Sequence, residues 1–384
     1  MLFTIVIFFI VLGILVLVHE WGHFVTARKA GMKVDEFGFG LPPRIIGFYK
    51  AEDGRWQRVG LKTKETSRTI WSLNWLPLGG FVRIKGEQGE AAGDSDSFAG
   101  KNVWQRIIVI SAGVTMNLIL AVVLLSIGFA LGVPQIVDDE QSLPASVKVR
   151  DQKIQIIEVL ANSPAAEAGL EVADVITAVD DKTLTKVSQL QDYLAQKADT
   201  SVSLSLERKK EPLLIAVTPT VLAETNQVGV GVGLIQTAIV SYPWYTAGWH
   251  GLTETLRMIW TIIFSFFLII QSLIVSHELI GEVYGPIGIA TLVGDAARLG
   301  FLYILQLTAT LSVIIAVINF LPFPALDGGR AFFLFIEALR GKPINAKVEN
   351  LMHNVGFILL LLLLLLVTLK DISRLSAGLF GWLG

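Results

Sequence analysis

Five long apolar stretches restrict this chain to folds that cross a lipid bilayer several times. Each stretch approaches the roughly 20 apolar residues that a helix needs to span the hydrocarbon core of a membrane. The composition agrees, because 53% of the 384 residues are hydrophobic, only 17% are charged and the mean hydropathy is +0.61. Ordinary soluble domains are less apolar. The stretches are Leu2–Val18, Ile107–Val133, Met258–Val275, Leu299–Leu326 and Leu351–Leu369.

The charges between these stretches predict their orientation. Residues 28–106 contain 14 of the 31 Lys and Arg, which by the positive-inside rule places this region in the cytoplasm. Residues 134–250 contain 15 Asp and Glu against 9 Lys and Arg, an acidic excess of 6, which fits translocation to the outside. The first apolar stretch has no basic residue before it and no small-residue cleavage site, so we expect a retained transmembrane helix rather than a secretion signal.

Net charge and cysteine content exclude other classes of protein. The net charge of −2 argues against a nucleic-acid partner, which would favour a basic face. The chain contains no cysteine, so disulfides and thiolate metal sites are excluded.

The end of the first apolar stretch carries a zinc-binding pattern, HEWGH. On a helix His19 and His23 lie one turn apart on one face, so both imidazoles can reach one zinc ion. Glu20 projects beside them, where it can take a proton from water. The alternative is a pair of core histidines with an incidental glutamate. Unpaired ionisable groups inside a membrane are costly and usually functional, which favours the metal site.

Two imidazoles do not complete a catalytic zinc site, which usually has three protein ligands. The candidate for the third is Asp327, in the segment NFLPFPALDGGRAFF at residues 319–333. The two prolines of this segment cannot lie within a regular helix, and its two glycines permit tight turns. Such backbone at membrane depth is tolerated only where it is buried in protein or lines a cavity. The alternative is that Asp327 only caps a helix that begins near Arg330.

The two motifs together resemble the site-2 protease family of intramembrane zinc metalloproteases, and within it the bacterial group of the regulator of sigma-E protease. HExxH in a first membrane helix and N-x-x-P-x-P-x-x-D-G-G in a later one carry the resemblance. Three further stretches support it along nearly the whole chain: AGMKVDEFGFGLPPRIIGF, LPLGGFVRIKGE and GPIGIA at residues 30–48, 76–87 and 285–290.

This resemblance implies a zinc cofactor, three zinc ligands and a general base, which are His19, His23 and Asp327 and, as the base, Glu20. The chain also departs from the family pattern. It has room for about one PDZ domain, where related proteins often carry two. The second-helix pattern AGP…N reads AGVTMN here, which loses the proline and keeps Asn117. Ile314 stands where some members have a further asparagine.

The predicted metal site makes a demand on the topology. If the first helix runs from outside to inside and the second returns, Asp327 reaches the inner side only when residues 258–275 do not cross the membrane alone. We therefore expect an interfacial amphipathic helix over residues 252–276 on the outer side. By length alone its uncharged run would be a span.

GGFVRIKG, residues 79–86, has the alternation of a strand that is flanked by turns. A helical substrate hides its scissile amide within its own hydrogen bonds, so a protease must hold it extended, and an exposed strand edge can do this by β-augmentation. The resemblance implies a membrane-re-entrant β-hairpin here. The alternative is an ordinary strand that packs over the cytoplasmic face. The predicted substrate-binding residues are Gly80, Phe81, Val82, Arg83 and Ile84.

Residues 156–184 resemble a PDZ domain. Ser163-Pro164 begins a short helix, Val172-Ala173-Asp174 stands where x-Gly-Asp is more usual, and residues 201–219 have the pattern of a hairpin. A PDZ groove binds an extended peptide end by strand addition. The domain could recognise the trimmed C-terminus of a substrate or exclude bulky ectodomains, and both interpretations stay open.

Asn319 also has two interpretations. Its side chain could stabilise an oxyanion as a catalytic residue, or it could satisfy backbone groups that Pro322 leaves unpaired.

The predicted fold is a polytopic α-helical membrane protein with about four transmembrane helices, a membrane-associated β-rich segment and one extracytoplasmic PDZ-like α+β domain. The expected function is an intramembrane zinc endopeptidase of the bacterial inner membrane, with its active site toward the cytoplasm. Resemblance suggests single-span substrates already shortened by another protease, such as anti-sigma factors or remnant signal peptides. The alternative is a non-catalytic, membrane-anchored PDZ scaffold, which would need a broken ligand set or a missing base.

The expected segments follow the motifs in chain order. They are a first helix at 1–27, a β-rich segment at 28–103 with its loop at 76–87, a second helix at 104–134, a PDZ domain at 140–222, a linker at 223–298, a third helix at 299–326, a cytoplasmic-side helix and loop at 327–350, and a last helix at 351–370.

Overall fold

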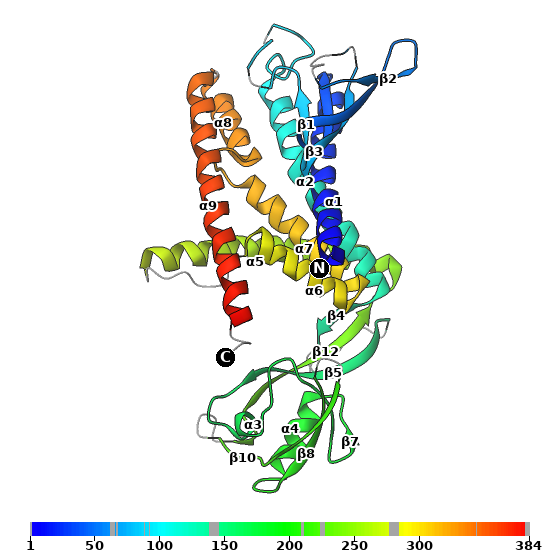
Figure 1. The fold of residues 1–384 in the computed structure, drawn as a ribbon, viewed down its shortest axis with the longest axis vertical. Helices are drawn as coiled ribbons and strands as arrows, with labels where there is room; N and C mark the ends of the chain where they lie inside the picture. Colours follow the sequence, from blue (N-terminus) through cyan, green and yellow to red (C-terminus); the bar gives the residue numbers. More distant parts are fainter. Residues whose placement is uncertain are drawn as a thin grey trace. The chain divides into compact units, whose positions relative to one another are not determined.

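The computed structural model describes residues 2–61, 66, 68–87, 89–91, 93–137, 146–208, 211–222, 227–275, 284–342 and 344–380. It divides into two compact units, Met1–Ser126 with Gly248–Gly384, and Ile127–Ala247. Among the described residues, five helices are long and apolar enough to cross a membrane, as a polytopic membrane protein requires. Figure 1 shows these helices, which are α1 (Leu2–Lys29), α2 (Val103–Leu131), α5 (Trp244–Val275), α7 (Phe301–Phe320) and α9 (Ala346–Phe380).

The first half of α1 packs against a helix that the sequence did not predict. This helix, α6 (Pro286–Leu299), lies within the expected linker. Val11 and Leu15 of α1 form a buried cluster with Val293 of α6. Gly294 allows the close approach, because a Cβ there would lie 2.5 Å from Cγ2 of Thr4.

α7 ends at Phe320, although the expected helix continued to residue 326. Leu321 takes an extended conformation with φ −61° and ψ 140°, as a residue before Pro322 must. A new helix, α8 (Asp327–Arg340), begins after the turn.

α5 is longer than the expected interfacial helix, since it begins at Trp244 rather than at residue 252. Its middle packs on α2 and α7, where Met258 and Ile262 contact a cluster that contains Ala121 and Val313. Figure 1 shows α5 running across the direction of α1 and α9 rather than alongside them.

A three-stranded sheet follows α1. Its strands are β1 (Val34–Lys50), β2 (Trp56–Val59) and β3 (Ile70–Ile84), in the order β2-β1-β3. β1 and β3 both bend sharply in their middle. Asn74 is buried at the bend and donates through Nδ2 to the Gly40 carbonyl at 3.1 Å.

The bends fold the two long strands into a meander. Phe37, in the first half of β1, lies opposite Val82 on one side and Trp71 on the other. The first half of β1 therefore lies between the two halves of β3. The second half of β1 pairs with the first half of β3 on one side and with β2 on the other. Residues 80–84 thus form one outer edge of the sheet as far as the described residues show. Residues 79–84 of the predicted strand are the end of this longer strand, and Lys85 and Gly86 lie in the turn that follows.

An aromatic cluster attaches the sheet to α1. Trp21 and Phe24 of α1 contact Phe37 and Trp71, with ring centroids 5.2–6.4 Å apart. Aromatic pairs of this geometry add about 0.5–1.5 kcal/mol each beyond the area they bury. The helix that carries the HExxH motif and the substrate-strand candidate are therefore held as one body.

The unit Ile127–Ala247 is an antiparallel sheet that packs on two helices, as expected of a PDZ-like domain. Ser163 caps the first helix by accepting from the Ala166 amide at 3.3 Å, which confirms the predicted helix start. The core gathers thirteen buried apolar residues around Ile154, Ile156 and Leu190.

The predicted end of this domain at residue 222 is too early. β12 pairs with β5 along most of its length and is therefore part of the same sheet, and its Val232 and Leu234 pack against the core of this unit. The elements are β4 (Val133–Ile136), β5 (Lys148–Val159), α3 (Pro164–Glu167), β6 (Val175–Val179), β7 (Lys182–Thr183), α4 (Val187–Ala195), β8 (Val202–Arg208), β9 (Glu211–Val217), β10 (Thr220–Val221), β11 (Val228–Gly229) and β12 (Val232–Ser241).

Candidate metal centre

Three side chains from opposite ends of the chain converge on one point. Nε2 of His19 lies 3.0 Å from Oδ2 of Asp327, and Nε2 of His23 lies 3.4 Å from the same oxygen. The two Nε2 atoms are 3.2 Å apart. In the part of the chain that the structure describes, the ligand atoms of these three side chains lie close enough together to hold one metal ion.

The spacing of these atoms fits zinc. Zn–N and Zn–O bonds of about 2.0–2.2 Å in a tetrahedral site place neighbouring ligand atoms about 3.3 Å apart. Oδ2 of Asp327 is buried and, among the described residues, has no donor other than the imidazoles. Such an oxygen needs a cation or a proton beside it. The donor set of two imidazoles and one carboxylate also matches catalytic zinc sites, which keep a fourth position open.

The second nitrogen of each imidazole has a partner that sets the ring orientation. Nδ1 of His23 lies 2.8 Å from the Val109 carbonyl, so it carries the proton and Nε2 keeps its lone pair. Nδ1 of His19 lies 3.3 Å from Nδ2 of Asn117. Turning this amide by 180° brings Oδ1, a buried atom without another partner, against Nδ1–H of His19. That orientation also leaves Nε2 of His19 for the metal.

Gly113 of α2 forms the floor under the two imidazoles. A Cβ at this position would lie 2.7 Å from both Cε1 and Nε2 of His19, and nearer still to Nε2 of His23. Cβ atoms essentially never come so close to a neighbour. The AGVTMN segment therefore supplies two residues that lie against the imidazoles, Gly113 and Asn117. The sequence pattern indicated only the asparagine.

Asp327 is the first residue of α8, and the helix N-cap is Leu326. Asp327 is therefore not the N-cap of this helix, and the alternative interpretation of it as a capping residue is wrong. The two glycines that follow Asp327 are helical. Their missing side chains let the start of α8 pack closely against the backbone of the preceding turn. A Cβ at Gly329 would collide with the Phe323 carbonyl, so the helix begins directly against the proline-containing turn.

α9 holds this turn through His353. Nδ1 of His353 accepts a hydrogen bond from the Ala325 amide at 2.8 Å, and Ala325 has a positive φ of 79°. A Cβ at Gly356 would lie 2.5 Å from the Pro324 carbonyl, so α9 and the turn are in direct contact. Sequence reasoning assigned His353 no role, because a lone histidine has no motif that would reveal this partner.

A cavity of about 160 Å³ opens beside the three ligand atoms. Glu20 lines this cavity together with Phe81, Val82 and Ile84 from the edge of the sheet. Gly80 lies against α1, since a Cβ there would be 3.5 Å from Cγ of Glu20. The predicted base and four of the five predicted substrate-binding residues are therefore brought together at the metal centre.

Arg83 and Asn319 lie apart from this cavity. Arg83 does not line the cavity and pairs with the buried Glu36, whose Oε2 lies 3.5 Å from Nη1. Asn319 lies in the last turn of α7 and is half-buried, and it is also not among the residues that line the cavity.

Two ion pairs tie α8 to the rest of the site. Arg330 pairs with Glu87, which follows β3, and both side chains line the cavity. Arg106 of α2 pairs with Glu337 further along α8. The element that carries Asp327 is thus connected both to the helix beneath the imidazoles and to the sheet.

Comparison with known proteins identifies the family. The model of Peptidase family M50 matches residues 7–363. A predicted zinc metalloprotease of Clostridium perfringens is 34% identical over 360 residues, which cover 93% of this chain and 95% of that protein. The regulator of sigma-W protease RasP of Bacillus subtilis is 27% identical over 453 residues, which cover 97% and 99%. Among solved structures, the PDZ domain of an SdrC-like protein from Listeria monocytogenes is 22% identical with a TM-score of 0.21, and the match covers 23% of this chain and 92% of that domain.

The chain therefore belongs to Peptidase family M50, the site-2 protease family. The expected resemblance and the expected class of enzyme, a membrane metallopeptidase, are confirmed by this match and by the five apolar helices.

Proposed function

We propose that His19, His23 and Asp327 hold a catalytic zinc ion and that Glu20 is the general base of an intramembrane endopeptidase. The observation that carries this proposal is the convergence of three ligand atoms within 3.0–3.4 Å of one another. A non-catalytic scaffold would need no such convergence beside a glutamate. Names of relatives that include zinc metalloprotease support the same metal.

Each residue has a separate task in peptide hydrolysis. A zinc ion bound there would lower the pKa of water to about 7 and polarise the scissile carbonyl. Glu20 accepts a proton from the attacking water and later donates it to the leaving amine. His23 and His19 keep their rings in place through Val109 and Asn117, so that little reorganisation is needed during the reaction.

The edge of the sheet presents the substrate. Residues 80–84 pair with β1 on one side only, as far as the described residues show, and Phe81, Val82 and Ile84 line the cavity. A substrate segment that adds to this edge becomes extended, and its amide bonds are then free of helical hydrogen bonds. The unpaired edge beside the cavity favours substrate binding by β-augmentation over the alternative, a strand that only covers the cytoplasmic face.

The proposed substrates are single-span membrane proteins that another protease has already shortened, such as anti-sigma factors or remnant signal peptides. The name of the Bacillus subtilis relative, regulator of sigma-W protease, supports the anti-sigma class. The PDZ-like unit has an edge that could bind a trimmed peptide end. Among the described residues, those at 232–235 of β12 pair with β5 alone, since the described pairing with β4 begins at Thr237. α4 packs near this part of the sheet, as a helix beside a peptide groove does.

The proposed topology has four spans in the inner membrane of a bacterium, with α5 on the outer interface and the metal centre toward the cytoplasm. The parity argument supports it, because Asp327 lies beside the histidines of α1. The direction of α5 across α1 and α9 gives further support. The PDZ-like unit would then be extracytoplasmic, in line with its acidic excess.

The test is cleavage of a single-span substrate by the detergent-purified full chain. Glu20→Gln should lower the rate by about 10²–10⁴-fold, the usual contribution of a general base, while its zinc content stays at the wild-type level. Glu254→Gln, on α5 and outside the cavity, is the matched control and should cleave normally. Equal cleavage by Glu20→Gln and wild type would remove the mechanism.

A further inference from the structure

A group of basic side chains that the catalytic site does not use lines a pocket at the end of α1. The pocket has a volume of about 380 Å³, within the range of roughly 300–1,000 Å³ found for small-molecule sites. Among the described residues, four basic side chains and two tryptophans line it, and no acidic side chain does. They are Arg28, Lys33, Lys50, Arg68, Trp56 and Trp71.

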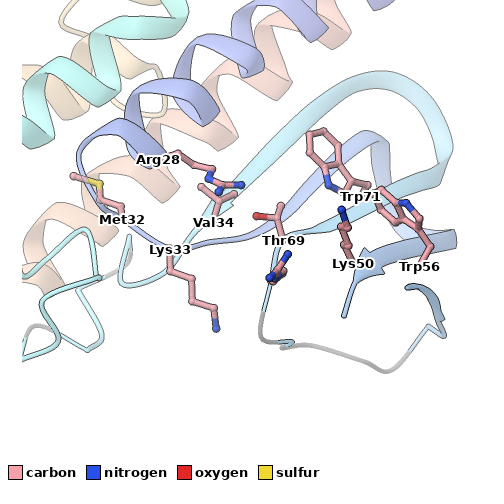
Figure 2. A pocket seen from close by; sticks show the side chains of 9 residues that line it. Arg28, Met32, Lys33, Val34, Lys50, Trp56, Thr69 and Trp71 are labelled. Atoms are coloured by element: carbon pink, nitrogen blue, oxygen red, sulfur yellow. The ribbon is translucent and has the colours of Figure 1, made fainter. Parts of the chain in front are cut away.

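The cations come from separate elements and meet around one hollow. Figure 2 shows the side chain of Arg28 at the end of α1. Lys50, at the end of β1, lies beside Trp56 and Trp71. Arg68 and Thr69 precede β3. A ligand in the pocket would therefore contact the end of a membrane helix and both long strands of the sheet.

Three of these cations are not neutralised within the described part of the chain. Lys33 pairs with Asp35 at 3.4 Å. No ion pair among the described residues involves Arg28, Lys50 or Arg68. Cations that gather without acidic partners repel one another unless an anion lies between them. The pocket thus favours a ligand that carries negative charge.

The surroundings favour a lipid over a soluble anion. Arg28 lies in the last turn of a helix that is long and apolar enough to span a membrane. Trp56 is 61% exposed, and tryptophan side chains are enriched at the membrane–water interface, at the level of the lipid headgroups. Basic clusters beside a membrane helix bind anionic headgroups, because each cation attracts the negative charge of the lipid.

We propose that this pocket binds the phosphate-bearing headgroup of an anionic phospholipid, with Arg28, Lys50 and Arg68 around the phosphate and the two tryptophans beside the glycerol and upper acyl region. The bound headgroup fastens the end of α1 to the sheet that carries the substrate-binding edge. This inference does not depend on the proposed peptidase mechanism, and its test needs no substrate.

The test measures lipid binding to the full chain in neutral detergent by native mass spectrometry. The probes are short-chain phosphatidylglycerol, short-chain phosphatidylcholine and inorganic phosphate. We expect saturable binding of phosphatidylglycerol at least about tenfold tighter than that of phosphatidylcholine, because the charge of the lipid decides recognition. Arg28→Gln with Lys50→Gln should weaken phosphatidylglycerol binding at least about tenfold.

The matched control removes the same number of charges, one from α1 and one from β2, the strand that pairs with the end of β1. Lys29 is in the same helical turn as Arg28, and Arg58 lies on β2, but neither side chain lines the pocket. The double variant Lys29→Gln with Arg58→Gln should bind phosphatidylglycerol within about twofold of wild type. Equal weakening in both double variants would show a diffuse charge effect and overturn the proposal.

Two further outcomes would also overturn it. Phosphatidylcholine that binds as tightly as phosphatidylglycerol would show that the anionic charge is not recognised. Inorganic phosphate that displaces phosphatidylglycerol at equal concentration would make the pocket a site for a soluble anion. Hydrogen exchange of the unmutated chain gives an answer even where a variant fails to fold. Added phosphatidylglycerol should protect residues 48–58 and 68–72, and exchange that does not change there would refute the site.

Discussion

Oδ2 of Asp327 lies 3.0 Å from Nε2 of His19, and this contact joins the first helix to a turn near the end of the chain. The oxygen is buried and has no donor among the described residues other than the imidazoles of His19 and His23. The backbone around Asp327 is built to place it there. Phe320 ends α7, two prolines turn the chain, and His353 holds the turn through the Ala325 amide.

Asp327→Ala should remove most of the bound zinc. It leaves two imidazoles, which do not complete a tetrahedral site, and exposes the metal position to water. We expect the zinc content of the purified chain to fall from about one ion per chain to below about a tenth, as measured by metal analysis after dialysis. Asp295→Ala, an exposed aspartate on α6, is the control and should keep its zinc. Full zinc retention by Asp327→Ala would refute the third-ligand assignment.

Gly113→Ala should weaken zinc binding although alanine is the better helix former. The added methyl group would overlap both imidazoles, which must move or lose their ring partners. Disturbed ligand orientation typically costs about 10–100-fold in metal affinity. Gly248→Ala, at a helical position with open space around it, is the matched control. Competition with a zinc chelator measures both, and unchanged affinity in Gly113→Ala would show that the imidazoles do not depend on this floor.

α5 should lie on one side of the membrane along its whole length. The chain has no cysteine, so single-cysteine variants need no background substitutions. Gly248→Cys lies in the second turn of α5 and Val275→Cys at its last described residue. In sealed cells or oriented vesicles, a membrane-impermeant thiol reagent should label both from the same side. Labelling of the two ends from opposite sides would make α5 a span and would contradict the four-span topology.

Ala173→Gly should stabilise the PDZ-like unit. Ala173 has a φ of 77°, and left-handed backbone costs a residue with a Cβ about 1–2 kcal/mol. The free energy of unfolding of this unit should rise by about 1 kcal/mol. Limited proteolysis of the full chain in urea measures it. Ala168→Gly, at a right-handed position with φ −76°, should instead lower the stability. A loss of stability in Ala173→Gly would show that the strain is absent.

The Asp174–Arg208 pair should make the same unit sensitive to acid. Arg208 donates to both carboxylate oxygens at 2.7 Å, and together with the Glu171 amide this holds the pKa of Asp174 below its usual range. Because the folded pKa lies below the unfolded value of about 3.9, the stabilisation is complete above that pH and disappears as the pH falls through the folded pKa.

Asp174→Asn measures this contribution. At pH 7 the variant should be less stable by about 1–2 kcal/mol, since the charge-assisted hydrogen bonds from Arg208 to the carboxylate are weakened while its bonds to Glu171 and the Gly169 carbonyl remain. The difference from wild type should shrink as the pH falls below about 4. Urea unfolding of the full chain at several pH values, followed by proteolysis within residues 148–241, gives both. A difference that stays constant down to the lowest pH would contradict the linkage.

Local signals in the sequence predicted most elements that carry the site. The HExxH motif placed His19, Glu20 and His23 on one helix, and the prolines predicted the break that frees Asp327. The alternation of residues 79–86 predicted the strand whose edge lines the cavity. The short helix after Ser163 was also predicted, because its cap is a local feature.

Other features depend on partners that are distant in sequence. Nothing local marks Gly113 as the floor of the imidazoles or His353 as the support of the turn, because each role is defined by what packs against it. The extent of the PDZ-like sheet and the existence of α6 were missed for the same reason. β12 is recognised by its pairing with β5, and α6 by its packing on α1.

The sequence by itself determined which residues have zinc chemistry and which segments are apolar enough for a membrane, because residue type, helical period and proline content are local properties. Only the tertiary structure decided that Asp327 lies within 3.0–3.4 Å of both histidines, that a strand edge lies beside Glu20, and that basic side chains from separate elements line a pocket at the end of α1. These are distances between separate elements, and packing free energy summed over many contacts sets them.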